Sequence, residues 1–231
     1  MFSNRQATNL TAAQLSRFQP KLALLRVIQQ EHPGAGRVSP RSCPPGSPCV
    51  PNSGAGPLPH PLYAEGEGDG GKTYTCGPSA TRNMVKGMTE VDYGEAQFVS
   101  WEHTTTDGTS AVEIRDALNA HFFNYGAWNV HVPSSTNDLM GRVADDVYYG
   151  QTTIQNVLTS PLPFWAHVAY EHFDVAYFYN FSTNDLGVAD EWNHDTVTPD
   201  GGHVNPFGFH IFPAPSDYNA VVESPDRQVV W

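Results

Sequence analysis

The sequence predicts an α+β fold, with helices first and an antiparallel sheet after them. Apolar residues recur at helical spacing between residues 76 and 149, whereas short aromatic and β-branched runs separated by turn residues follow Pro163. Runs of helices followed by runs of strands form segregated layers, unlike the alternating order of a parallel sheet. A chain of 231 residues is long enough for one large core plus an appendage.

Composition divides the chain into three stretches. Residues 1–31 contain a helical pattern over 10–31, in which Pro20 is expected to kink or split the helix. The apolar stripe of this helix consists of Leu15, Phe18, Leu22, Leu25 and Ile28. Residues 32–72 are dense in Pro, Gly and Ser, which predicts an extended linker that can drape over the domain. Residues 73–231 carry the globular domain.

Three helices are expected at the start of this domain. The first begins at Cys76, because Gly77 and Pro78 suit a first turn and an apolar stripe follows them. The second is expected around 109–122 and the third around 135–149. The stripes comprise Ala80, Met84, Val85 and Met88 in the first helix, Val112, Ile114, Ala117, Leu118 and Phe122 in the second, and Leu139, Val143 and Val147 in the third.

Strands are expected after Pro163. The segments FWAHVAY at 164–170, FDVAYFYNF at 173–181, LGVAD at 186–190 and FGFHIF at 207–212 are short, aromatic and β-branched. Turn residues separate the second segment from the third, which predicts a hairpin.

Charge and hydropathy exclude two classes of partner. The net charge of −12 would repel phosphate backbones, so we expect no nucleic acid to bind through a general basic surface. No stretch approaches the roughly 18–20 continuous apolar residues of a membrane span.

The N-terminus lacks the apolar run of a secretory signal, so we expect a cytoplasmic protein, or an extracellular one if the true start lies upstream of Met1.

The cysteines fall into two groups. Cys43 and Cys49 lie in SCPPGSPC, where a short-loop disulfide can form if the compartment is oxidising. Cys76 stands alone, and an unpaired thiol is either an inert core residue or a reactive group.

The position of Cys76 favours reactivity. At the first turn of a helix, unsatisfied N–H groups and the macrodipole stabilise negative charge and hence a nucleophilic thiolate. Such a cysteine needs a base and a third group that orients the base. A hairpin would bring Asp190 beside His172 and both toward Cys76. Asp174 competes for the orienting role, but it lies on the same strand face as His172, where it is poorly placed to contact the ring.

These residues resemble papain-like cysteine peptidases. TYTCGPSATRNM, GTSAVEIRDALN and HFDVAYFYNFSTNDLGVADEW come in the order of that family, with most similarity to the double-glycine (bacteriocin-leader) peptidases, cysteine peptidase family 39, and their stand-alone relatives. The resemblance covers roughly residues 70–231. It implies a papain-like fold, peptide bond hydrolysis after small residues, no cofactor, and a catalytic triad of Cys76, His172 and Asp190. A peptide or protein is then the substrate.

Two positions depart from the family pattern. These peptidases usually carry a Gln six residues before the cysteine, which helps bind the oxyanion, but this chain has Gly70 there. Loss of one oxyanion donor typically costs about 10²–10³ in rate. The backbone N–H of Cys76, Lys72 or Asn83 are the remaining candidate donors. Phe178 stands where the family prefers Gly.

Two other kinds of function therefore remain open. The missing Gln suggests a catalytically silent domain that binds a peptide without cleaving it. The same thiol–His–Asp arrangement also serves acyl transferases and isopeptidases, which use amine acceptors.

Metal chemistry is the last alternative. Histidines are frequent in the second half of the chain, and the loop at 193–203 can offer Asp195 and Asp200 to a hard cation. The candidate ligands in strand-like segments and loops are His167, His172, Asp174, His194, His203 and His210. Their spacings match no known ligand pattern, so no metal site is predicted.

Overall fold

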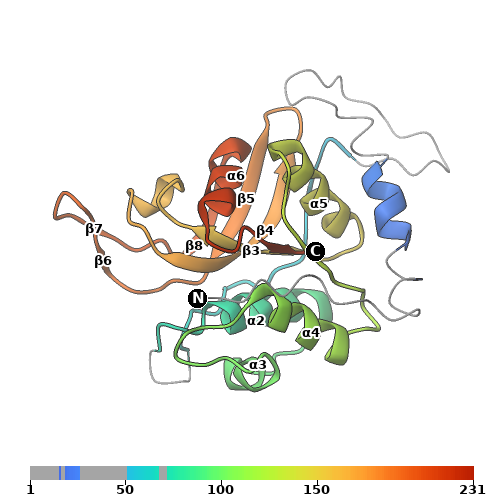
Figure 1. Ribbon diagram of the computed structural model, residues 1–231, viewed down its shortest axis with the longest axis horizontal. Helices are drawn as coiled ribbons and strands as arrows, with labels where there is room; N and C mark the ends of the chain where they lie inside the picture. The colour runs from blue at the N-terminus through green and yellow to red at the C-terminus, as the bar shows by residue number, and fades with distance from the viewer. Residues whose placement is uncertain (1–15, 17–18, 27–50, 68–71) are drawn as a thin grey trace.

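The computed structural model describes residue 16 and residues 19–26, 51–67 and 72–231. Over these residues helices pack on an antiparallel sheet, which confirms the predicted α+β class (Figure 1).

Five labelled helices lie within the described residues. They are α2 (Cys76–Thr89), α3 (Glu95–Trp101), α4 (Ala111–His121), α5 (Thr136–Tyr148) and α6 (Ala214–Glu223). The three helices expected from periodicity are confirmed as α2, α4 and α5. Ser110 forms a capping box with Glu113 at the start of α4, and the Ser135 hydroxyl accepts a hydrogen bond from the backbone N–H of Asp138 in α5. Helix α3 was not predicted because it is too short to display a periodic stripe.

The main sheet is antiparallel throughout. Its strands are β1 (Ser53–Ala55), β2 (Val130–His131), β3 (Thr153–Leu158), β4 (Glu171–Asn180), β5 (Asp185–Asp190), β8 (Gly208–Pro213) and β9 (Val229–Val230). The order is β2-β9-β3-β4-β5-β8, and β1 pairs with β4. The short strands β6 (Thr196–Val197) and β7 (His203–Val204) form a separate hairpin. The expected hairpin is present, with Asn180 opposite Asp185 in β4 and β5.

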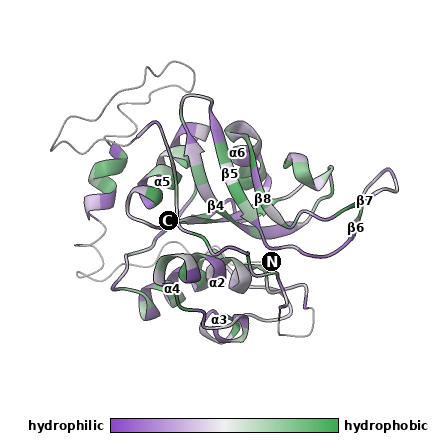
Figure 2. Ribbon diagram, turned by 180° about the vertical axis from the view of Figure 1, so that it is seen from behind, coloured by the Kyte–Doolittle hydropathy of each residue, from purple (hydrophilic) through white to green (hydrophobic). Residues whose placement is uncertain are grey.

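Each face of the sheet has its own hydrophobic core. On one face Val175 of β4 packs with Met84 of α2 and Ile114 of α4. On the other face the next residue, Ala176, packs with residues of α5 and α6 that include Leu139. This follows from the alternation of side chains along a strand. Figure 1 shows α2, α3 and α4 below the sheet, and Figure 2 shows hydrophobic residues concentrated in the central strands.

Two segments differ from the expectations for strands. Residues 164–170 are not a strand: Pro163–Trp165 forms a 3₁₀ turn, and Ala166 and His167 follow with positive φ, a backbone conformation incompatible with a strand. Strand β3 was not predicted, because Gln155 and Asn156 interrupt its apolar pattern. Both side chains are nevertheless buried.

Part of the predicted linker is packed onto the domain. Strand β1 pairs with β4, and the backbone N–H of Gly56 donates to the carbonyl of Tyr177. A Cβ on Gly87 of α2 would lie 2.2 Å from the carbonyl oxygen of Pro57, so a glycine is required where this segment crosses the helix. Cys43 and Cys49 lie outside the described residues.

The N-terminal helical stretch is described over residues 19–26. Leu24 and Leu25 are buried in the core on the α5 side of the sheet, and the Lys21 ammonium lies 2.7 Å from the Asp146 carboxylate of α5. Leu15, Phe18 and Ile28 of the predicted stripe lie outside the described residues.

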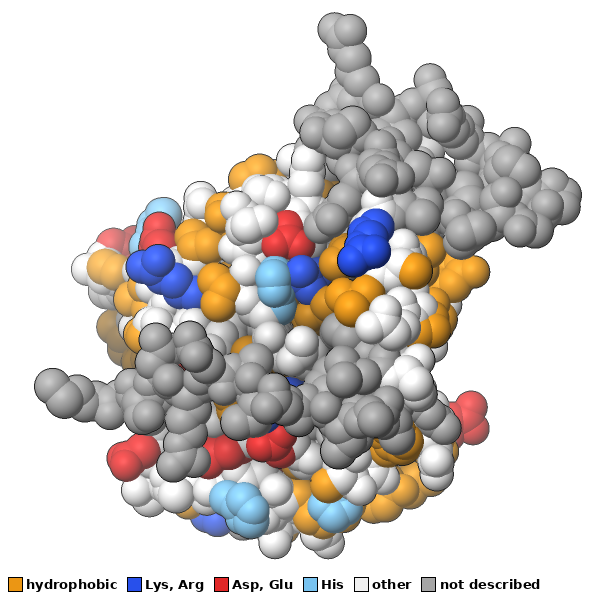
Figure 3. Space-filling view, turned by 45° about the vertical axis from the view of Figure 1, so that its right-hand side comes forward, with side chains coloured by type: hydrophobic (Ala, Val, Ile, Leu, Met, Phe, Trp, Pro, Cys, Tyr) orange, Lys and Arg blue, Asp and Glu red, His pale blue; other side chains and the backbone are white. Residues whose placement is uncertain are grey.

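The surface shown in Figure 3 carries basic side chains in small separate groups, and acidic ones follow part of its lower half. Among the residues that the structure describes, no helix combines the length and apolarity needed to cross a bilayer.

Candidate active site

Cys76 is the first residue of α2 and is partly exposed. Its thiol is free, and no acidic residue occupies the first turn of the helix. Gly77 allows this end of α2 to pack closely, because a Cβ there would lie 2.1 Å from the Thr109 side chain. The helix end therefore offers positive potential and backbone N–H groups to a thiolate.

His172 and Asp190 meet beside this helix end. His172 is the second residue of β4, Asp190 is the last of β5, and both are buried. The Nε2 atom of His172 lies 3.2 Å from Oδ1 of Asp190, in an ion pair that is not aligned well enough to count as a hydrogen bond. The two strands are antiparallel neighbours, which is why residues so far apart in sequence come together.

The pKa of His172 is influenced by both Asp190 and Cys76. Burial lowers it, but the nearby Asp190 carboxylate and, to a smaller extent, Cys76 outweigh burial and raise it well above the usual value. With Nε2 directed at Asp190, Nδ1 is the nitrogen left for the thiol.

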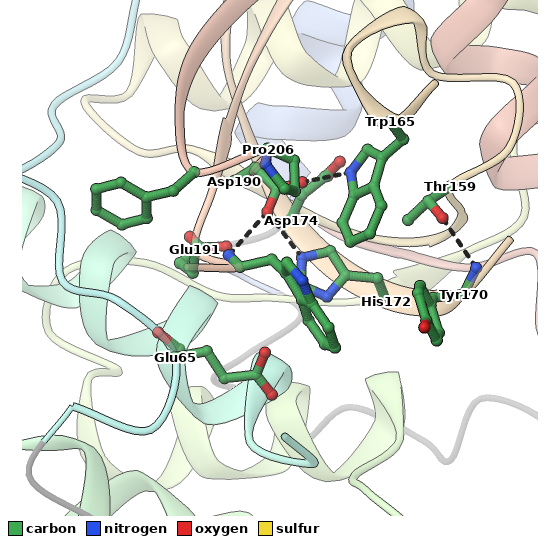
Figure 4. A network of polar contacts seen from close by, with 12 residues as sticks. Glu65, Thr159, Trp165, Tyr170, His172, Asp174, Asp190, Glu191 and Pro206 are labelled. Atoms are coloured by element: carbon green, nitrogen blue, oxygen red, sulfur yellow. Dashed lines mark hydrogen bonds and ion pairs between the residues drawn. The ribbon is translucent and has the colours of Figure 1, made fainter. Parts of the chain in front are cut away.

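Asp190 is held by donors from two tryptophans. The indole Nε1 of Trp165 donates to its Oδ2 at 2.7 Å, and the backbone N–H of Trp192 donates to its Oδ1 at 2.8 Å (Figure 4). These two donors fix the direction of the Asp190 side chain, with Oδ1 facing His172.

Asp174 does not take the orienting role. Its Oδ1 accepts a hydrogen bond from Gln155 at 3.2 Å, and Gln155 also donates to Asp217 at 3.3 Å. Burial, Asp217 and Asp190 raise the pKa of Asp174 well above its usual value. Burial therefore disfavours the charged form of Asp174.

Two further buried acids border the site. Burial raises the pKa of Glu191 well above its usual value, and Asp190 adds to this effect. The Glu65 carboxyl accepts the backbone N–H of Thr75 at 2.9 Å, and the Glu65 N–H donates to the carbonyl of Glu191 at 2.8 Å. Because both acids are buried, the site combines low solvent access with several titratable groups.

The structure brings together the three residues that the sequence singled out. Gly70, where the family pattern has Gln, lies outside the described residues. Trp165 and Glu65 were missed. Trp165 lies in a segment read as a strand and Glu65 in one read as linker, so local composition gave no signal for either.

The candidate metal ligands form no common centre. His203 Nδ1 lies 2.7 Å from Asp195 Oδ2 on the exposed hairpin, and His210 contacts the carbonyl of Pro206. The Thr198 hydroxyl donates a hydrogen bond to the Asp200 carboxylate. Within 19–26, 51–67 and 72–231, no three His, Cys, Asp or Glu side chains are grouped as a metal site requires.

Comparison with known proteins finds no matching family model and no matching curated protein.

Proposed function

We propose that the chain is a thiol hydrolase of peptides with a papain-like fold. The supporting observation is the arrangement of Cys76 at a helix N-terminus, with His172 near enough for Cys76 to raise its pKa, and Asp190 facing Nε2 of the ring. Nucleophile, base and orienting acid come from α2, β4 and β5, and together they supply the three groups that this chemistry uses. The motif resemblance adds the preference for a bond after small residues.

In this proposal Nδ1 of His172 takes the thiol proton, and Sγ of Cys76 attacks the peptide carbonyl carbon. The tetrahedral oxyanion collapses as the imidazolium gives its proton to the leaving amine, which leaves a thioester on Cys76. A water then loses a proton to His172 and attacks the thioester, releasing the acid and the free thiol. Asp190 holds the imidazole in the same orientation during both steps.

Alkylation of Cys76 by iodoacetamide tests the thiolate–imidazolium pair. We expect Cys76 to react well below pH 7 in the unmodified protein, and His172→Ala to remove that low-pH reactivity. Mass spectrometry of separate peptides distinguishes alkylation of Cys76 from alkylation of Cys43 and Cys49. His203→Ala is the matched control, since His203 is an exposed histidine paired with an aspartate elsewhere.

Reactivity of Cys76 only near the pH of an ordinary thiol, unchanged by His172→Ala, would contradict the proposal. A reactive Cys76 combined with a bound peptide that survives incubation would favour the silent binding domain. Incorporation of an added amine in place of water would favour an acyl transferase.

A further inference from the structure

The carboxyl group of Glu65 lies against the peptide unit that precedes the nucleophile. Glu65 is 3% exposed, and its Oε1 accepts the backbone N–H of Thr75, the residue before Cys76. The Glu65 backbone is fixed in turn by its hydrogen bond to Glu191. In Figure 4 the Glu65 carboxyl and Asp190 lie on opposite sides of the His172 ring.

The second carboxyl oxygen is unpaired. Oε2 of Glu65 is buried and has no hydrogen-bond partner among the described residues. A buried charged oxygen without a partner is costly, whereas the acid form places the proton on Oε2 and makes it a donor. Because Oε1 already accepts the N–H of Thr75, the O–H of the acid form has no acceptor among the described residues.

The groups around Glu65 bring its pKa close to neutral pH. Burial raises its pKa to about 7; the charge of His172 and the N–H of Thr75 lower it, and Glu95 and Asp190 raise it. Glu95 is itself engaged, since its Oε1 accepts the N–H of Gly66 at 3.1 Å. A substantial fraction of Glu65 is therefore neutral at pH 7.

We propose that Glu65, as a neutral acid, donates a hydrogen bond from Oε2 to the oxyanion that forms when Cys76 attacks a carbonyl, beside the backbone N–H of Cys76. The inference rests on the proposed function and supplies the donor that Gly70 lacks. No proton is transferred in this step. An ionised Glu65 would instead repel the developing oxyanion.

Asn83 is less suited to this role. Its side-chain amide donates to the carbonyl oxygens of Tyr63 at 2.9 Å and Ser79 at 3.1 Å, so both of its N–H groups are used inside the fold.

A purely structural role for Glu65 is the competing explanation, because its bond to Thr75 also ties the loop to the start of α2. Glu65→Gln separates the two roles: the amide oxygen still accepts the N–H of Thr75, and the amide nitrogen donates at every pH. Glu65→Ala removes both functions. Glu67→Gln makes the same change two residues away on a side chain that is 52% exposed.

Two reagents distinguish the oxyanion from the thiolate. Iodoacetamide alkylates the Cys76 thiolate without forming an oxyanion, whereas p-nitrophenyl acetate acetylates it through a tetrahedral intermediate and releases p-nitrophenolate. Both products are read on the Cys76 peptide by mass spectrometry, with Cys76→Ala as the blank. The ratio of acetylation to alkylation rate at each pH corrects for the thiolate fraction.

We expect Glu65→Ala to lower this ratio by about 10²–10³ and to leave alkylation within a few-fold. In the unmodified protein and in Glu67→Gln the ratio should fall as pH rises above about 7, while in Glu65→Gln it should stay level.

Equal ratios in Glu65→Ala and the unmodified protein, or equal losses of alkylation and acetylation, would overturn the inference. If Glu65→Ala does not fold, the pH profile of Glu65→Gln decides, and a fall above pH 7 like that of the unmodified protein overturns it. Failure of the proposed function is separate, since it removes the low-pH alkylation of Cys76 in the unmodified protein.

Discussion

Glu102 makes the stability of this protein depend on pH in a direction opposite to that of an ordinary surface carboxylate. It follows α3 directly, is fully buried, and neither carboxyl oxygen has a well-aligned partner among the described residues. Burial raises its pKa from 4.5 to about 8, a shift that the Thr81 hydroxyl opposes and that Glu113 and Glu95 reinforce. Glu102 is therefore a neutral acid in the folded protein at neutral pH.

The free energy follows from linkage. Between pH 4.5 and about 8 the folded protein keeps a proton on Glu102 that the unfolded chain releases, so the free energy of unfolding falls as pH rises through this window. A shift of this size, at about 1.36 kcal/mol per pH unit, corresponds to a loss on the order of 5 kcal/mol. The loss is complete above the folded-state pKa.

Glu102→Gln removes this titration and keeps the shape of the side chain. At pH 5 we expect the variant to be less stable than the unmodified protein by about 1–3 kcal/mol, because the amide N–H groups lack partners. At pH 9 the order should reverse. Urea unfolding followed by tryptophan fluorescence at pH 5, 7 and 9 measures both proteins.

Glu102→Gln must be compared with the unmodified protein at each pH, because other buried acids also titrate in this range. The pKa values of Asp217 and Asp145 are raised to about 7 and about 8, so both proteins should lose stability with rising pH. Glu223→Gln, an exposed change of the same kind, is the control. Parallel pH curves for Glu102→Gln and the unmodified protein would refute the reasoning.

Two further substitutions test the site and the N-terminal segment. Trp165→Phe removes the indole donor to Asp190, so we expect acetylation of Cys76 to slow about tenfold, as loss of a hydrogen bond to a charged group implies; an unchanged rate would show that the indole does not position Asp190. Lys21→Ala leaves the buried Asp146 carboxylate without its cation, so the free energy of unfolding should drop by about 3 kcal/mol. Arg26→Ala, on the exposed side of the same helical stretch, should change it by less than about 0.5 kcal/mol, and equal effects of the two would contradict the buried ion pair.

The buried acids give the proposed site a common electrostatic character. Asp174, Glu65 and Glu191 all have raised pKa values because burial disfavours their charged forms. Asp190 differs in its partners, since Trp165 donates to its side chain. One carboxyl thus faces the imidazole with two fixed hydrogen-bond donors, while burial disfavours the charged forms of its neighbours.

Much of the helical part of the fold could be predicted from the sequence. A stripe of apolar residues at helical spacing depends only on local order, so α2, α4 and α5 were found with their ends nearly correct. The β4–β5 hairpin was found for the same reason. Strand β3 was missed because its buried polar residues are satisfied by distant partners such as Asp217.

The candidate site was likewise predicted only in part. Cys76, His172 and Asp190 were selected by motif and order along the chain, which the sequence displays. The contact between Asp190 and Trp165 was not visible, since it depends on how a loop returns to the end of β5. Sequence composition assigned Glu65 to a linker, whereas β1 and the following residues pack on the domain.

The sequence by itself determined the α+β class, three of the helices and the hairpin, and it selected Cys76, His172 and Asp190 as the candidate nucleophile, base and orienting acid. These features arise from local periodicity and residue chemistry, which the order of amino acids displays directly. Only the tertiary structure decided which carboxyls are buried, which oxygen faces the imidazole, and that Glu65 reaches the peptide before Cys76. Ionisation and hydrogen bonding depend on groups brought together from distant parts of the chain, and their mutual distances are set by folding alone.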